Sequence, residues 1–305
     1  MTTEKTAPRV ALATCSVLPD LDPDDAPLVQ ALADRGVDAR AAVWDDPEID
    51  WASFDAVVVR STWDYAVRRD EFVTWAQGVP RLLNAASVLR WNTDKGYLRE
   101  LEAADVPVIP TLWLDPERNL SSRAIHTRLP AHGDFVIKPV VSAGARDTGR
   151  YQSGEAYSRG RAIQHAKNLL VSGREVMVQP YVTSVDTTGE VRLVLIDGEL
   201  SHATRNKAHL TVPHHPTRGL YPDEQLSAFE PSAEQVEVAR RALQVAADAV
   251  AGGDPASFLY ARVDLVTGDE GTPVVIEVEL TEPSLGMAHA PGALDRFADA
   301  IAARV

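Results

Sequence analysis

The sequence predicts an α/β (α+β) fold, with a parallel sheet in its N-terminal part and antiparallel hairpins farther along. Two observations carry this prediction. Apolar strand-like runs alternate with helical segments over residues 10–78, which is typical of a parallel sheet covered by helices. Nearer the C-terminus, pairs of segments with a period of two flank short turns that contain Gly, and this pattern indicates antiparallel hairpins.

The bulk properties favour a soluble globular protein of 305 residues, long enough for about two domains. A formal net charge of −14 argues against nucleic acid or an anionic membrane as partner. The first residues lack the apolar core of a signal peptide, and no apolar segment is long enough to span a bilayer. The single cysteine, Cys15, is expected to be a small buried residue. We therefore expect a cytoplasmic protein.

The N-terminal part is predicted to contain strands at residues 10–14, 39–43 and 56–60, with helices at residues 26–35 and 68–77. Parallel sheets bind ligands beyond the carboxyl ends of their strands. Arg60 and Asp64 lie at such an end, which makes them candidates for substrate binding. A capped loop with a packed Trp is an equally good interpretation of the same residues.

The middle of the chain contains two lysines that adjoin candidate anion-binding features. A helix is expected from Asn92 to about Ala104, with Lys95 in its first turn, where a cation is unfavourable for the helix dipole. Lys138 lies on the predicted strand 135–139, and the small residues 142–149 that follow are consistent with a loop over phosphates. An ordinary hairpin loop is the alternative for that segment.

The next elements are predicted from turn and capping signals. A helix at 154–171 precedes a strand at 175–179, and Asp-Gly at 197–198 indicates a hairpin of strands 190–196 and 199–205. Residues 209–227, rich in His, Pro and Gly, are expected to be a long loop. The capping box Ser232-x-x-Gln235 opens another helix.

The most informative pattern is a hairpin of strands 259–266 and 274–280. If the apolar faces of both strands cover one core, odd positions of the first strand pair with even positions of the second. Val274, Ile276, Val278 and Leu280 then face the core. The opposite face gathers four charged side chains: Arg262, Asp264, Glu277 and Glu279.

Three carboxylates on one sheet face repel each other, by about 4 kcal/mol per pair at contact with an effective dielectric near 20. A divalent cation removes that cost, and oxygen ligands suit Mg²⁺ or Mn²⁺. The hairpin therefore predicts a metal site. A solvated sheet face, on which acids only add solubility, is the other interpretation.

The motifs, taken in chain order, resemble the ATP-grasp superfamily in the branch of glutathione synthetases and ribosomal-protein glutamate ligases. They are Asn92-Thr-Asp-Lys95, Val-Ile-Lys138-Pro, the small-residue loop, Gln179-Pro-Tyr-Val182, Glu190-Val-Arg192, Arg205, Arg262-Val-Asp264 and Glu277-Val-Glu279. Longer stretches at 60–65, 90–98 and 277–284 are similar to actinobacterial biosynthetic ATP-grasp ligases, including cyclo-ligases that close O-ureido-D-serine to D-cycloserine.

The resemblance implies a fold in which two α+β subdomains clamp a nucleotide: an N-terminal domain at 1–115, a lid subdomain at 116–182 and a C-terminal subdomain at 183–305. It also implies roles for individual residues. The nucleotide would contact Lys95, Lys138, Ser142, Gly144, the hinge residues Gln179, Pro180, Tyr181 and Val182, and Asp186 at the ribose. The metal ligands would be Asp264, Glu277 and Glu279, with Glu279 standing where most members have Asn.

The remaining implied roles concern the reaction. Arg192, Arg205 and Arg262 would face the transferred phosphoryl group or a substrate carboxylate. Arg60, Asp64, Thr281 and Ser284 would contact a small amino-acid-like substrate. The expected enzyme uses ATP and Mg²⁺ (or Mn²⁺) to convert a carboxylate or carbonyl oxygen to an acylphosphate, which a nitrogen attacks, with ADP and phosphate as products.

Three functions fit this resemblance. The first is intramolecular cyclisation of O-ureido-D-serine in antibiotic biosynthesis. The second is an intermolecular amino-acid or peptide ligase of glutathione synthetase type, and the third is a non-catalytic nucleotide-binding module. The sequence leaves open whether the chain forms a homodimer, which stereoisomer it binds and how many metal ions it holds.

Overall fold

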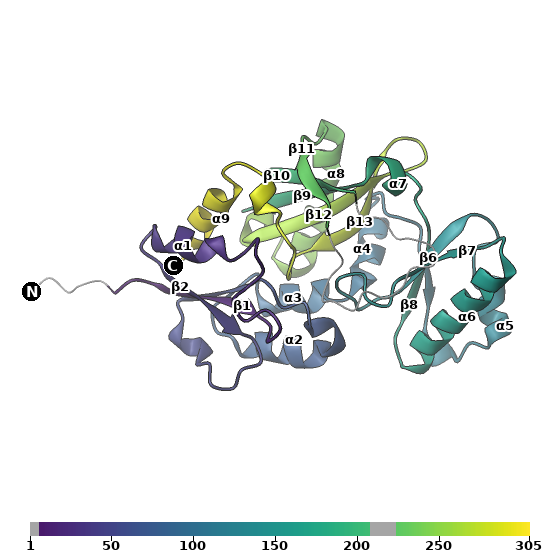
Figure 1. Ribbon diagram of the computed structural model, residues 1–305, viewed down its shortest axis with the longest axis horizontal. Coiled ribbons are helices and arrows are strands. Elements are labelled where there is room, and N and C mark those ends of the chain that lie inside the picture. Colours follow the sequence, from purple (N-terminus) through teal and green to yellow (C-terminus); the bar gives the residue numbers. More distant parts are fainter. Residues whose placement is uncertain (1–5, 208–223) are drawn as a thin grey trace, which may run out of the picture.

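The protein is described here from a computed structural model that covers residues 6–207 and 224–305. Three sheets organise the chain, as Figure 1 shows, and their strand orders are β2-β1-β3-β4, β5-β8-β6-β7 and β11-β10-β9-β12-β13. The first sheet is parallel, and the other two are antiparallel. The predicted α/β (α+β) class is confirmed.

The first sheet contains β1 (Arg9–Thr14), β2 (Asp38–Val43), β3 (Ala56–Val59) and β4 (Leu82–Leu83). All four residues of β3 are buried, because helices and loops cover both faces of a parallel sheet. The helices of this region are α1 (Pro27–Ala33), α2 (Arg69–Gly78), α3 (Ala86–Asn92) and α4 (Leu98–Ala103). Every strand and helix expected before residue 80 is present, and α3 is an addition.

The second sheet contains β5 (Leu112–Leu114), β6 (Asp134–Pro139), β7 (Gly149–Gln152) and β8 (Val176–Pro180). Helices α5 (Ser122–Arg128) and α6 (Ala156–Val171) pack on it around buried residues such as Phe135 and Leu169. Strand β5 pairs with β8 and so belongs to the second sheet. The domain boundary expected after residue 115 therefore lies C-terminal to a strand of that sheet.

The third sheet contains β9 (Glu190–Ile196), β10 (Glu199–Asn206), β11 (Leu226–Phe229), β12 (Tyr260–Thr267) and β13 (Pro273–Glu279). Its helices are α7 (Val185–Thr188), α8 (Ala233–Val250) and α9 (Ala293–Ala302). Asp197 and Gly198, with φ of 54° and 79°, form the predicted two-residue turn. Strand β11 occupies the end of the expected long loop, whose residues 208–223 lie outside the described part.

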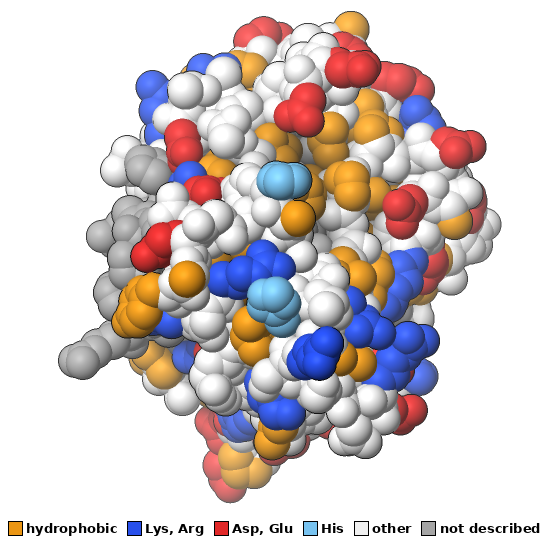
Figure 2. Space-filling view, turned by 90° about the vertical axis from the view of Figure 1, so that its right-hand side faces the viewer, with side chains coloured by type: hydrophobic (Ala, Val, Ile, Leu, Met, Phe, Trp, Pro, Cys, Tyr) orange, Lys and Arg blue, Asp and Glu red, His pale blue; other side chains and the backbone are white. Residues whose placement is uncertain are grey.

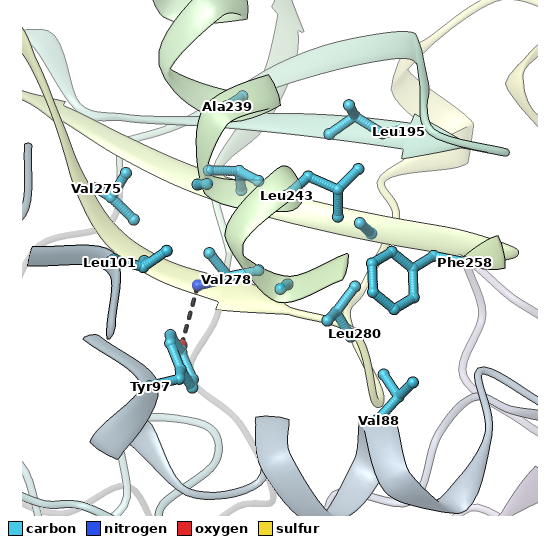
Figure 3. Packing of buried hydrophobic residues seen from close by; sticks show 14 of the residues in the cluster. Val88, Tyr97, Leu101, Leu195, Ala239, Leu243, Phe258, Val275, Val278 and Leu280 are labelled. Atoms are coloured by element: carbon cyan, nitrogen blue, oxygen red, sulfur yellow. Dashed lines mark hydrogen bonds between the residues drawn. The ribbon is translucent and has the colours of Figure 1, made fainter. Parts of the chain in front are cut away.

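The N-terminal region and the third sheet share one apolar core. Helix α8 lays Ala239 and Leu243 on β12 and β13, and Val88 and Leu101 from α3 and α4 pack into the same cluster (Figure 3). The amide of Val278 donates to the Tyr97 hydroxyl at 3.0 Å, the contact dashed in Figure 3. This packing holds the acidic hairpin rigidly against the first domain.

The register of the acidic hairpin is confirmed at its functional end. Arg262 pairs with Glu279 and Asp264 with Glu277, so all four side chains share a face. A β-bulge after Asp264 then shifts the pairing by one residue. The shift turns Val275 into the core, where it is fully buried, and turns Ile276 to the opposite face. The expectation that Val274 and Ile276 face the core is therefore wrong, because a bulge inserts one residue into a pattern of period two and Val274 now pairs with the cavity-lining Val266.

Charge is unevenly distributed over the molecule. The end of the molecule that carries the second sheet presents many Lys and Arg side chains (Figure 2), and in residues 116–182 these outnumber Asp and Glu, against the excess of acid in the whole chain. Opposite net charges on the two parts attract each other across the space between them. No helix among residues 6–207 and 224–305 combines the length and apolar character needed to cross a membrane.

Candidate active site

A cavity of about 440 Å³ lies where the three sheets meet. The N-terminal region contributes Trp63 to its lining, the second sheet contributes Lys138 and Gln179, and the third sheet contributes Asp264. Side chains from all three bodies converge on this one space, which is large enough for a small ligand.

One end of the cavity is apolar. Val136, Val266 and Ile276 line it, together with the predicted hinge segment Gln179 to Val182. The buried Gln179 side chain donates to the Thr111 hydroxyl at 2.8 Å, which fixes the start of the hinge. Ile276 reaches this surface because of the bulge in β12 and β13. An apolar surface beside the hinge suits a flat heterocycle such as adenine.

Two lysines follow the apolar end. The ammonium of Lys95 lies 2.6 Å from a carboxylate oxygen of Glu277 and donates to the Ser142 carbonyl at 2.8 Å. Lys138 lies nearby on β6, where it is half-buried, and its desolvation lowers its pKa to about 8. Ser142 and Gly144, from the predicted small-residue loop, also line the cavity. Two ammonium groups beside a loop of small residues are well placed to neutralise phosphates.

The acidic face of the hairpin forms the floor of the cavity. Arg262 donates to both carboxylate oxygens of Asp264 at 2.8 Å and lies 2.6 Å from an oxygen of Glu279. Burial raises the pKa of Asp264 to about 6, against the effect of Arg262. Burial also opposes ionisation of Glu277, but the ion pair with Lys95 lowers the pKa of that carboxyl.

The donor chemistry of this floor fits a divalent cation. Within the described residues, no group of three or more His, Cys, Asp or Glu side chains is already arranged as a metal cage, because Lys95 and Arg262 engage the carboxylates. The acids of the lining nevertheless exceed its bases: Asp22, Glu190, Glu224, Asp264, Glu277, Glu279 and Glu282 against Lys95, Lys138, Arg192 and Arg262. This oxygen-rich excess suits Mg²⁺ or Mn²⁺ carried by a polyphosphate.

Arg192 stands beside this floor on β9, directly across the sheet from Asp264. Its guanidinium lies 2.8 Å from Glu190 and 2.6 Å from Glu224. Asn206, which pairs with Glu190 on β10, also lines the cavity. Sequence analysis missed these two glutamates and Asn206, although Glu190 occurs in the same motif as Arg192.

Two residues expected at the nucleotide lie elsewhere. Arg205 does not line the cavity, and its guanidinium stacks over the Phe229 ring at 4.2 Å. A bulge between Leu200 and His202 shifts β10 by one residue, so Arg192 pairs with Thr204 and Arg205 points to the other face. Asp186 also lies outside the lining, hydrogen-bonded to the Tyr181 hydroxyl and 3.3 Å from Arg150.

Three of the four substrate candidates are structural. Arg60 is fully buried, pairs with Asp25 at 2.9 Å and lies over the Tyr260 ring. Asp64 accepts from Trp44 at 2.9 Å and from Arg68 at 2.6 Å.

Thr281 is also fully buried, and its hydroxyl donates to Asn92 at 3.0 Å. Neither it nor the other two line the cavity. Ser284 does line it, and it is the substrate candidate that the structure brings to the site.

The segment from Thr281 to Leu285 crosses this end of the cavity without regular structure. Each of its five main-chain carbonyls accepts a hydrogen bond from a different side chain, at 2.6 to 2.9 Å. The donors are, in order, Tyr260, Trp63, Arg60, Arg262 and His202. The fully buried Arg60 therefore holds the wall of the site through the Pro283 carbonyl.

The comparisons with known proteins agree with this geometry. A family model described as the N-terminal domain of the D-cycloserine synthetase DcsG matches residues 10–84. The cycloserine biosynthesis protein DcsG of Streptomyces lavendulae is 37% identical over 304 residues, which cover 97% of this chain and 98% of that protein. The crystal structure of D-cycloserine synthetase DcsG is similar with a TM-score of 0.85 and 36% identity, covering 97% of this chain and 99% of that one.

More distant structures share the fold. D-alanine–D-alanine ligase from Bacillus anthracis, solved with ATP, has a TM-score of 0.64 at 14% identity and covers 97% of this chain and 96% of its own. Three sheets around a cavity with two lysines and an acidic hairpin, together with these similarities, define an ATP-grasp ligase. Within that superfamily the chain belongs to the D-cycloserine synthetase family, which it matches over nearly its whole length.

Proposed function

We propose that this protein uses ATP to close O-ureido-D-serine to D-cycloserine, with ADP and phosphate as further products. The observation that carries the proposal is that 97% of the chain matches DcsG at 37% identity. The cavity supports it, because the lining of this space of about 440 Å³ combines apolar side chains such as Val136 and Ile276 with the two lysines and the acidic hairpin. ATP supply and the absence of disulfide chemistry in a chain with one Cys favour the cytoplasm as its location.

The residues of the cavity divide the work of phosphoryl transfer. Lys95 and Lys138 neutralise the phosphate oxygens of ATP, and the hinge around Tyr181 holds the base. Asp264 and Glu277, which face each other across the hairpin, would hold Mg²⁺ or Mn²⁺ once it displaces the ion pairs. That ion, when bound, neutralises charge on the phosphates and aligns them.

Three bonding changes complete the proposed reaction. The substrate carboxylate takes the terminal phosphoryl group of ATP and ADP leaves. The oxygen-bound nitrogen of the ureido group attacks the acyl carbon and closes the ring, and the expelled phosphate carries away the proton of that nitrogen. Water then removes the carbamoyl group as carbon dioxide and ammonia. Arg262 and Arg192, both buried beside the floor, stabilise the negative charge that the first two steps develop.

The proposal is tested by supplying O-ureido-D-serine as the only amino compound and measuring ADP release together with cycloserine by mass spectrometry. We expect one ADP for each ring formed. ADP release that requires a second amino compound would instead establish the intermolecular ligase, the second candidate from the same nucleotide chemistry.

A non-catalytic nucleotide-binding module is tested with Glu277→Gln. We expect turnover to fall by about a hundredfold, because the variant loses a charge at the metal-phosphate centre. Glu270→Gln, an exposed change in the loop of the same hairpin, serves as the matched control and should keep its activity. Unchanged turnover in Glu277→Gln with intact nucleotide binding would refute the assigned metal chemistry.

A further inference from the structure

Glu282 differs from five other carboxylates of the cavity, Glu190, Glu224, Asp264, Glu277 and Glu279, in how its charge is balanced. Within the described residues, Glu190 and Glu224 pair with Arg192, and Glu277 pairs with Lys95. Asp264 and Glu279 pair with Arg262.

Glu282 lines the same cavity and is only 7% exposed, but it makes no ion pair with a described Lys, Arg or His. Its carboxyl is hydrogen-bonded to Tyr65, a residue of the N-terminal region. A buried carboxylate without a cation is costly unless a ligand supplies the missing charge.

The wall of the cavity holds Glu282 in place. Its own carbonyl accepts a hydrogen bond from the Trp63 indole at 2.8 Å, and the next carbonyl, of Pro283, accepts one from Arg60 at 2.7 Å. Both donors come from the N-terminal region, and Arg60 is in turn paired with Asp25. The main chain that carries this carboxyl is therefore fixed before any ligand arrives, which reduces the entropy lost on binding.

We propose that Glu282 receives the ammonium group of the amino-acid substrate. This inference rests on the proposed function, in which the substrate carboxylate reacts and the ammonium does not. Because this ammonium takes no part in the chemistry, the enzyme can use it to recognise the substrate and to orient it. A charge-assisted hydrogen bond from the ammonium to a carboxylate on a fixed main chain serves both purposes. Held in this way, the substrate turns its own carboxylate toward Arg262, which donates to the carbonyl of Ser284 at 2.9 Å in the same wall.

The test compares two ligands in two variants. The ligands are O-ureido-D-serine and 3-(ureidooxy)propanoate, which has the same skeleton without the ammonium group. In Glu282→Gln we expect the KM for O-ureido-D-serine to rise about 10- to 100-fold, as for loss of one hydrogen bond to a charged group. The KM for ATP should stay within about twofold, and wild type and variant should bind the ligand without an ammonium group equally well. Glu270→Gln, an exposed change of the same charge, is the control.

Each outcome decides the inference. An unchanged KM for O-ureido-D-serine in Glu282→Gln overturns it, as does an equal loss for both ligands, which would indicate a structural role. Calorimetric binding of D-cycloserine to the complex with ADP separates this inference from the proposed function. Suppose that wild type forms no cycloserine but binds it, and that Glu282→Gln loses this binding. The proposed cyclisation is then refuted, while the role of Glu282 in binding an ammonium group is supported. If wild type binds neither ammonium-bearing ligand, both fail.

Discussion

Asn84 offers the sharpest test of how the N-terminal region is joined to the acidic hairpin. Its side-chain amide donates to the carbonyls of Tyr260 and Leu280 at 2.9 and 2.8 Å, and its oxygen accepts from the Leu259 amide at 2.8 Å. The side chain is buried, and the residue has φ of 58°, in the left-handed region. One short side chain therefore satisfies three buried main-chain groups at the ends of β12 and β13.

The cost of Asn84→Ala follows from these contacts. Three buried hydrogen bonds contribute about 1 kcal/mol each, so their loss destabilises the fold by about 3 kcal/mol. Placing Ala in the left-handed region adds about 1 kcal/mol. Asn119 serves as the reference for this second contribution, because it has φ of 47°, is exposed, and makes one exposed side-chain hydrogen bond, to the Glu117 carbonyl at 3.3 Å. Asn119→Ala should therefore cost about 1 kcal/mol, and the difference between the variants measures the buried hydrogen bonds.

The assay is urea denaturation followed by Trp fluorescence, with the free energy of unfolding obtained for wild type, Asn84→Ala and Asn119→Ala. We expect Asn84→Ala to be less stable than Asn119→Ala by about 3 kcal/mol. Equal destabilisation of the two variants would show that the three contacts contribute nothing, and the account of the junction would be refuted.

Three other results follow from the site and its surroundings. Burial lowers the pKa of Lys138 to about 8, and bound phosphates favour its charged form, so the affinity for ATP should weaken up to tenfold per pH unit above that value. Calorimetry of ATP binding in buffers of different ionisation enthalpy should detect proton uptake, and Lys138→Met should abolish that uptake. Arg205→Met should change the KM for ATP by less than about twofold and cost about 1 kcal/mol of stability from its contact with Phe229, so a large rise in KM would contradict its placement outside the cavity. Burial lowers the pKa of His165 below 6.5, so the contribution of this residue to stability is present above pH 6.5 and is lost as the pH falls toward the lowered pKa. In His165→Gln the melting temperature should therefore fall less steeply with decreasing pH than in wild type, and an unchanged dependence would count against this assignment.

The hairpin of β12 and β13 shows which features of the site the sequence predicts. Alternation with a period of two was enough to predict that Asp264 lies opposite Glu277 and that Arg262 shares their face, and the structure confirms this pairing. The residue roles at the nucleotide rested on chain order, and most of those residues do line one cavity. The resemblance placed Lys95 and Lys138 there, and the position of Lys95 in the first turn of a predicted helix pointed to an anionic partner as well.

Two misplaced residues have the same physical cause. A regular hairpin about Asp197-Gly198 would put Arg192 and Arg205 on one face, but a bulge after Leu200 separates them. Another bulge, after Asp264, turns Ile276 from the core to the cavity. Nothing in the composition of either strand marks the inserted residue, because the energy that favours it comes from packing against distant elements.

The sequence by itself determined which elements form, which faces are apolar and which charges share a strand, because these depend on spacings of two and of three to four residues. Only the tertiary structure decided which charges meet. It buried Arg60 against Asp25 as a support, paired Glu277 with Lys95, and left Glu282 at the cavity without an ion pair among the described residues. Those outcomes depend on contacts between segments that are distant in the chain, such as Lys95 with Glu277 and Arg60 with Pro283, which no local pattern encodes.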